Sequence, residues 1–223
     1  NIPNSTKNQQ KCYKSYQIGL NPNITKIRLD IAEYIENILK SGHGSVMEHA
    51  SYSFAIEGVS RVFTGEMNRH RAGMAISEGS MRYIRFDNMP YWIPPSIQGE
   101  DVSIDRILSE PQSFDNNLIV KKAVTRKIFE KAFEDAEMRY KELLEVWKDE
   151  LLPESKFHAK KQITSMMRRI VPMGIATGGV WTGNIRAIRH IITMRTSEAA
   201  EEEICFVFSN IIKRIRDLEP TLF

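Results

Sequence analysis

The chain has 223 residues, of which 42% are hydrophobic and 26% are charged, and this balance excludes a fibre or a disordered tail. Its 31 lysines and arginines face 28 acidic residues, and the resulting formal charge of +3 argues against a general nucleic-acid or membrane-surface binder. Cys12 and Cys205 lie too far apart in the sequence to form a disulfide framework or a Cys-x-x-Cys metal clip.

The sequence also bears on where the protein works. No apolar run approaches the roughly 20 residues of a membrane-spanning helix, and the first residues contain no apolar signal core. With only two cysteines, the chain is expected to be cytoplasmic, without a membrane partner. It begins at Asn1 rather than at a methionine, so we treat the N-terminus as incomplete. Because repeats and low-complexity stretches are lacking, residues 1–223 are expected to form a single domain.

The first half of the chain contains two helical and two strand-like patterns. Apolar residues recur at helical spacing from an N-cap at Thr25 to residues 41–42, and the alternation in residues 50–56 predicts a half-buried strand. We expect a short helix over residues 59–68 and another strand over residues 81–86. Three prolines then predict an irregular loop: Pro90, Pro94 and Pro95.

The second half is mainly helical. Residues 114–151 keep close to a helical period and predict a long helix, broken once, and a shorter helix is expected over residues 153–170. Residues 174–183 read as a strand or turn. Asn184 is expected to cap a helix through Met194, and Ser197 a last one through Leu218. The predicted class is α+β with helices dominant.

The arginines are concentrated in two windows. Residues 61–85 hold five arginines and no lysine, and residues 168–195 repeat this pattern. The ten are Arg61, Arg69, Arg71, Arg82, Arg85, Arg168, Arg169, Arg186, Arg189 and Arg195. Because the guanidinium fork suits bidentate contact with phosphate or carboxylate, the two windows predict a pocket for a polyanionic ligand.

The first window includes Arg69-His70-Arg71, followed by small residues, two glycines and serines up to Tyr83. Such a backbone can approach a ligand closely and offers amide and hydroxyl donors to phosphate oxygens, which suits a nucleotide. The segment is neither a P-loop nor a dinucleotide-binding glycine fingerprint. The structural alternative is a solvated turn with incidental charges.

In the second window, Arg186 and His190 are four residues apart and therefore share one helix face. A ligand along that face would meet a guanidinium and an imidazole together. For Arg189 we favour a structural role. For Arg195 the alternative is ion pairing with the acidic run that follows it, Glu198, Glu201, Glu202 and Glu203.

Four ordered segments carry a resemblance to a known family. Arg69-His70-Arg71, followed after eight residues by Ser80-Met81-Arg82-Tyr83, resembles the signature of the flavin-dependent thymidylate synthases, the ThyX family. Residues 42–49 look like the family's GHxSxxEH segment, and residues 168–172 look like its RxxLP run. Residues 184–195 resemble its NxR…HxxxxR helix.

The resemblance implies a homotetramer of single-domain α+β subunits with an antiparallel or mixed sheet and with active sites built between subunits. It implies reductive methylation of dUMP to dTMP with FAD, with methylenetetrahydrofolate as one-carbon donor and NADPH as reductant. It further implies that neither a metal nor a nucleic acid takes part.

The resemblance also assigns site residues. FAD is expected to contact His49, Ser51, Arg69, His70, Arg71, Glu78, Asn184, Arg186 and His190. The dUMP contacts are expected to be Glu66, Arg69, Glu78, Gly79, Ser80, Met81, Arg82, Arg168 and Arg195. Arg195 would be catalytic, because a fixed cation beside the pyrimidine favours its ionised, electron-rich form. Arg82, Arg168 and the loop at Ser80 would hold the phosphate, and the histidines would orient the flavin.

The cysteines agree with a flavin enzyme. The other route to thymidylate needs a cysteine nucleophile on C6 of uracil. Cys205 lies between Ile204 and Phe206 on an apolar helical stretch, and Cys12 has no basic neighbour in sequence, so both are interpreted as structural thiols.

Three positions depart from the family pattern. The spacer before Ser80 has eight residues where seven is commonest, Glu66 replaces the usual Gln, and Met74 replaces a frequent Ser. All the arginines that the mechanism uses are present.

Two rival interpretations stay open. A metal hydrolase could use His43, His49 and His70, but their spacing gives neither HxxxH nor HExxH. A non-catalytic nucleotide- or RNA-binding module could use the arginine windows, although the sequence has no platform of alternating aromatic and basic residues.

Overall fold

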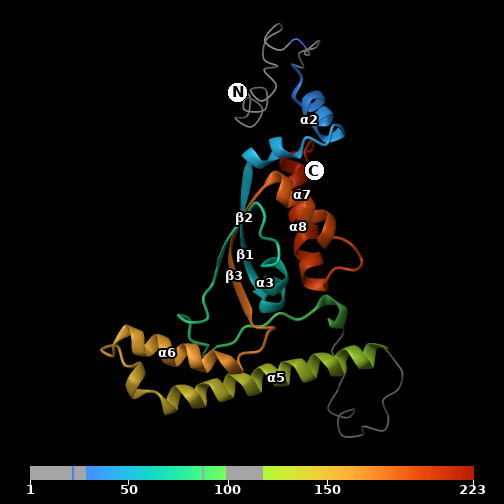
Figure 1. Cartoon of the computed structure of the whole chain (residues 1–223). Helices are drawn as coiled ribbons and strands as arrows, with labels where there is room; N and C mark the ends of the chain where they lie inside the picture. The colour runs from blue at the N-terminus through green and yellow to red at the C-terminus, as the bar shows by residue number, and fades with distance from the viewer. Residues whose placement is uncertain (1–21, 23–28, 87, 99–117) are drawn as a thin grey trace. The chain divides into compact units, whose positions relative to one another are not determined.

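The computed structural model describes residues 22, 29–86, 88–98 and 118–223 (Figure 1). The chain divides into two compact units, which we describe separately. The first unit comprises residues 1–55, 66–77 and 180–223, and the second comprises residues 56–65 and 78–179. That residues 1–223 act as a single domain stays a prediction.

The described residues include a small antiparallel sheet. Its order is β1 (Ser51–Ser60), β3 (Ala176–Asn184) and β2 (Met74–Glu78). Two pairings show that β1 and β3 are antiparallel. Ser53 Oγ of β1 lies 2.8 Å from Thr182 Oγ1 of β3, whereas Ile56, later in β1, faces Gly178, earlier in β3. The strand predicted over residues 50–56 is confirmed, and it continues to Ser60.

Helices build the rest of the first unit. They are α2 (Ile31–Lys40), the 3₁₀ helix η1 (Gly44–His49), α7 (Ile185–Arg195) and α8 (Glu202–Leu218). Isoleucines at helical spacing form the buried face of α7: Ile185, Ile188, Ile191 and Ile192. This face explains why α7 packs against η1 and α8. Each such side chain contributes about 1.5–3 kcal/mol to the stability of the folded chain when it is buried. The N-terminus of α7 is thereby fixed beside η1.

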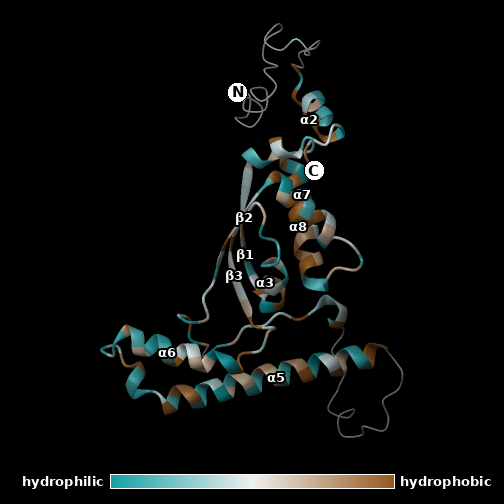
Figure 2. Cartoon of the chain, viewed as in Figure 1, coloured by the Kyte–Doolittle hydropathy of each residue, from teal (hydrophilic) through white to brown (hydrophobic). Residues whose placement is uncertain are grey.

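The second unit is built around a long helix. Its helices are α5 (Leu118–Val146), α6 (Phe157–Met167) and three 3₁₀ turns, η2 (Pro95–Ile97), η4 (Asp149–Leu151) and η5 (Arg168–Ile170). Apolar and polar residues alternate along α5 in Figure 2, and Tyr140 of α5 packs in one core with Ile163 and Met167 of α6. Their shared core consists of Phe86, Met89, Tyr140, Leu151, Ile163, Met167 and Ile175. Phe86 meets Tyr140 edge to face at 5.9 Å, which ties the segment after β2 to α5.

The strand predicted over residues 81–86 is wrong. Residues 81–83 form a turn, and the strand lies earlier, in Met74–Glu78. The large side chains after Ser80 have other neighbours. Tyr83 stacks on Phe157 with 6.0 Å between the ring centres, and Phe86 enters the helical core. These side chains pack on helices rather than on a sheet.

The helix predictions hold, with corrections at their ends. The short helix over residues 59–68 is α3 (Arg61–Met67), and those over residues 114–151 and 153–170 are α5 with η4 and α6 with η5, residues 114–117 lying outside the described residues. The predicted cap Thr25 also lies outside them, and Asp30 caps α2 by accepting from Glu33 N at 2.7 Å.

The caps of the last two helices differ in outcome. Asn184 caps α7 as predicted, because its Oδ1 accepts from Ala187 N at 2.8 Å. Ser197 does not cap α8, since its hydroxyl bonds back to Met194 O and a helix begins only after Glu201, whose carboxylate accepts from two backbone N–H groups.

Candidate functional site

Arg195 lies at the centre of a hydrogen-bonded cluster in the first unit. As the last residue of α7, it donates from Nε to His70 Nε2 at 2.7 Å and from Nη1 to Glu66 Oε2 at 2.8 Å. Its Nη2 lies 3.4 Å from Glu66 O. The Arg195 side chain is only 16% exposed, so these charge-assisted hydrogen bonds orient the guanidinium in a largely buried environment. The acidic run after Ser197 is therefore not the partner that this structure gives to Arg195.

The pKa of His70 is lowered from its ordinary value. Burial lowers its pKa most, and the nearby charges of Arg195 and then His190 and Arg69 lower it further, against an opposing effect of Glu66. Because Nε2 accepts from Arg195, the neutral ring carries its proton on Nδ1. This imidazole orients its neighbour and does not add to the positive charge.

The two arginines that flank His70 point outward. Arg69 is 73% exposed and reaches Glu66 Oε1 only at 3.7 Å, and Arg71 is also exposed. The backbone leaves α3 through bonds from Arg69 N to Glu66 O and from His70 N to Met67 O. The Arg-His-Arg segment thus presents two guanidiniums to the surroundings and one imidazole to the cluster.

The N-terminus of α7 is joined to the turn after Arg71. Asn184 N donates to Gly73 O at 3.0 Å, while the side chain of Asn184 caps α7. Gly73 has a φ of +72°, and a Cβ atom there would lie 2.5 Å from Asn184 Nδ2. Glycine is therefore required at this position for both the backbone conformation and the cap.

Segment 42–49 meets α7 through Arg186. Arg186 Nη1 donates to Glu48 Oε1 at 2.6 Å, and a Cβ atom at Gly44 would lie 3.0 Å from Arg186 Nε. Both charged side chains are about half exposed. His49, Ser51 and His190 are exposed as well. Apart from Glu78, the residues expected to contact FAD belong to this unit.

The remaining predicted residues belong to the second unit: Glu78, Gly79, Ser80, Met81, Arg82 and Arg168. Glu78 at the end of β2 is paired with Arg61 Nη1, and Arg61 Nη2 donates to Gly79 O. A turn follows, in which Tyr83 N donates to Ser80 O at 3.1 Å. Arg82 is exposed, and its carbonyl accepts from Thr164 Oγ1 of α6 at 2.7 Å.

Arg61, Thr164 and Lys161 were not among the predicted site residues. Arg61 had a signal, because it begins the first arginine window, whereas nothing in the sequence singles out Thr164. Lys161 Nζ lies 4.8 Å from the ring centre of Tyr83, and their hydrogen bond is the main cause that lowers the pKa of Tyr83. Both Tyr83 and its stacking partner Phe157 are exposed.

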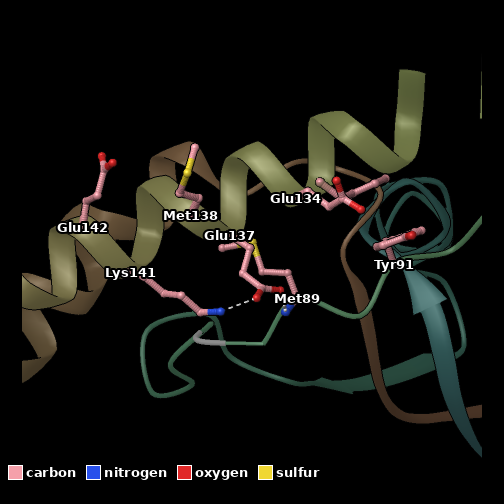
Figure 3. A pocket seen from close by; sticks show the side chains of 8 residues that line it. Met89, Tyr91, Glu134, Glu137, Met138, Lys141 and Glu142 are labelled. Carbon is pink, nitrogen blue, oxygen red and sulfur yellow. Dashed lines mark hydrogen bonds and ion pairs between the residues drawn. The ribbon is translucent and has the colours of Figure 1, made fainter. Parts of the chain in front are cut away.

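A groove of about 540 Å³ lies elsewhere in the second unit, beside α5 (Figure 3). It is lined by Met89, Tyr91, Phe133, Glu134, Glu137, Met138, Lys141 and Glu142, none of which is a predicted site residue. Glu137 accepts from Met89 N at 3.0 Å and from Lys141, and these bonds lower its pKa. Tyr91 stacks on Phe133 at 4.3 Å and closes one end of the groove.

Among the described residues, the structure contains neither a metal-binding cluster nor a helix that could span a membrane. In the part of the chain that the structure describes, His, Cys, Asp and Glu side chains do not gather in groups of three or more that could hold a metal ion. Among these same residues, the helices lack the combination of length and apolar character that a bilayer crossing needs. Cys205 is a half-buried free thiol in α8, and Cys12 lies outside the described residues.

Comparisons with known proteins agree with the resemblance. The family profile described as Thymidylate synthase complementing protein matches residues 4–221. The flavin-dependent thymidylate synthase of Mycobacterium avium (strain 104) is 33% identical over 193 residues, covering 86% of this chain and 68% of the relative. That of Mycobacterium tuberculosis (strain ATCC 25177 / H37Ra) is 32% identical with the same coverage.

A solved structure shares the fold. It is thymidylate synthase X (ThyX) from Helicobacter pylori, crystallised with FAD and dUMP, which matches with a TM-score of 0.58 and 20% identity. The match covers 98% of this chain and 90% of that chain.

Proposed function

The chain belongs to the family of flavin-dependent thymidylate synthases, and on this premise we propose that it converts dUMP to dTMP with FAD, taking the one-carbon unit from methylenetetrahydrofolate and electrons from NADPH. The observation that carries the proposal is the cluster of Arg195, His70 and Glu66. It joins side chains more than 120 residues apart, and each lies in or next to a segment that carries the resemblance.

Arg195 is proposed as the catalytic residue. A guanidinium beside the pyrimidine stabilises negative charge on the ring, and loss of one such contact typically costs about 10²–10³ in rate. Glu66 and His70 would hold the guanidinium in place. Of the five N–H groups of an arginine, three are used in the bonds found among the described residues, which leaves two for the substrate.

The first unit offers a donor set that suits FAD, which supplies two-electron redox chemistry when bound. The exposed guanidiniums of Arg69, Arg71 and Arg186 match the pyrophosphate of the cofactor. The exposed side chains of His49, Ser51 and His190 add further hydrogen-bonding groups. Asn184, His70 and Glu78 complete the proposed set.

For dUMP we propose that Arg82, Arg168 and the turn at Ser80 hold the phosphate, with Gly79 and Met81 contributing backbone groups. Glu66, Arg69, Glu78 and Arg195 complete the proposed contacts. The working form is proposed to be a cytoplasmic homotetramer with active sites shared between subunits, without a nucleic-acid, membrane or metal partner. If the protein sediments as a monomer and is fully active, the proposal that subunits share active sites is wrong.

The first experiment is spectroscopic. Purified protein should be yellow or become so with FAD, and its flavin absorbance should bleach with NADPH under argon. The same sample should form dTMP from dUMP and methylenetetrahydrofolate. A colourless protein that takes up no FAD would instead favour a nucleotide- or RNA-binding module.

The second experiment tests Arg195. Arg195→Ala should lower the rate of dTMP formation by about 10²–10³ or more while FAD stays bound. The control is Arg139→Ala, since Arg139 pairs with Glu142 on an exposed face of α5 and should change neither property. Full turnover in Arg195→Ala would show that the assigned role is wrong.

A further inference from the structure

Arg61 connects directly to the segment proposed to bind dUMP. It is the first residue of α3, and its guanidinium spans two groups, the carboxylate of Glu78 through Nη1 and the carbonyl of Gly79 through Nη2. Both side chains of the ion pair are largely buried, with exposures of 15% for Arg61 and 18% for Glu78. The Nε atom of Arg61 is buried without a hydrogen-bond partner among the described residues. A guanidinium so enclosed is a fixed part of the structure rather than a mobile surface cation.

The backbone of Arg61 is anchored independently of its side chain. Arg61 N donates to Met173 O at 2.9 Å, and Ser60 Oγ caps the following turn by accepting from Val62 N at 3.0 Å. Gly79 is anchored too, because its N–H donates to Gly178 O at 2.9 Å. The fork of Arg61 therefore joins two backbone positions that the sheet region already holds.

The charge of Glu78 matters for the residues that follow it. Ser80 and Arg82 lie two and four residues further on and are proposed to bind a phosphate. A carboxylate with no guanidinium beside it would repel a nearby phosphate in such a partly buried environment, because electrostatic interactions are screened less there than in water. Pairing with Arg61 removes that repulsion, and the bond to Gly79 O fixes where the phosphate-binding turn begins.

We propose that Arg61 is a positioning residue for dUMP, which neutralises Glu78 and fixes Gly79 so that the turn from Ser80 to Arg82 can accept the phosphate. The inference rests on the proposed function and adds to it a residue that would act through others. It also gives the carboxylate of Glu78 a protein partner in Arg61, where the resemblance implies only a ligand contact for Glu78.

The test measures dUMP affinity in the FAD-loaded protein by calorimetry. Arg61→Met should weaken dUMP binding by about 10- to 100-fold, the range for losing charge-assisted hydrogen bonds, while FAD content stays unchanged. Arg61→Lys keeps the charge but lacks the fork, so it should fall between Arg61→Met and the parent protein. The KM for dUMP should rise more than kcat falls.

The matched control is Arg85→Met. Arg85 belongs to the same arginine window and also donates to a carbonyl, Leu151 O at 3.0 Å, but among the described residues its side chain makes no hydrogen bond or ion pair with residues 78–82. Its affinity for dUMP should stay within about twofold of the parent protein.

A double variant separates positioning from general damage. If the main effect of Arg61→Met is that the carboxylate of Glu78 loses the neighbouring guanidinium, adding Glu78→Gln should recover part of the lost affinity, whereas two independent defects, each measured in its single variant, would add. This comparison also serves if Arg61→Met folds poorly, because the double variant removes the charges of both members of the ion pair. Affinity within twofold of the parent in Arg61→Met, or additive losses in the double variant, would overturn the inference. A parent protein that binds no dUMP would instead overturn the proposed function.

Discussion

Gly73 offers a sharp test of how the Arg-His-Arg segment is tied to α7. Gly73 and Gly58 have almost the same backbone conformation, with φ values of +72° and +71°. A Cβ atom at Gly58 would have nothing within 4 Å, whereas at Gly73 it would lie 2.5 Å from Asn184 Nδ2 and 2.9 Å from its Cγ. Alanine at these two positions therefore imposes the same backbone strain but only one collision.

The expected losses follow from these two terms. The left-handed conformation costs an alanine about 1–2 kcal/mol, which should be the whole effect of Gly58→Ala. In Gly73→Ala the side chain of Asn184 must also move, and loss of its cap on α7 adds about 1 kcal/mol. At about 2–4 °C per kcal/mol for a chain of this length, Gly73→Ala should melt about 2–4 °C below Gly58→Ala.

The assay is thermal unfolding of the two variants, together with the amount of FAD that each retains. Gly73→Ala should lose FAD more readily, because Asn184 and Arg71 belong to the proposed cofactor site. In an Asn184→Ala background, Gly73→Ala should cost no more than Gly58→Ala costs in the parent protein. Equal melting temperatures and equal FAD contents for the two single variants would refute the reasoning.

Two further predictions concern other parts of the chain. Because the pKa of His70 is lowered, the unfolded chain binds more protons, and stability should fall as the pH drops below about 6.5. His70→Asn should flatten this part of the pH dependence of the melting temperature, and an unchanged dependence would contradict the assignment. Gly174→Ala would place a Cβ atom 2.5 Å from Phe133 Cζ and should destabilise the protein by about 1–3 kcal/mol. Gly65→Ala, with nothing within 4 Å, is its control and should not destabilise.

The helices were largely predictable from sequence because their signal is local. The isoleucines of α7 recur at helical spacing, and Asn184 stands where an N-cap should. Strand β2 was not predictable in the same way. It is only five residues long, Met74–Glu78, and its partner β3 lies about 100 residues further along the chain. The larger residues after Ser80 carried the stronger strand pattern although they pack on helices.

The site was predictable in its membership but not in its pairings. The resemblance drew attention to Arg195, His70 and Glu66, but the sequence offered the acidic run after Ser197 as an alternative partner of Arg195. The bond to Glu66 depends on where α3 ends relative to α7, which local sequence does not encode. The pairing of Arg61 with Glu78 is hidden for the same reason, since 17 residues separate them.

Strand β3 ends at Asn184, and α7 begins at the next residue, without a connecting loop. Because no loop connects β3 to α7, an added or missing residue at this junction would have to shift one of the two elements. Since each residue of an α-helix turns by about 100° and rises about 1.5 Å, one insertion near Asn184 would swing the far end of α7 to another side of its axis. The number of residues at this junction therefore determines the direction in which Arg195 points.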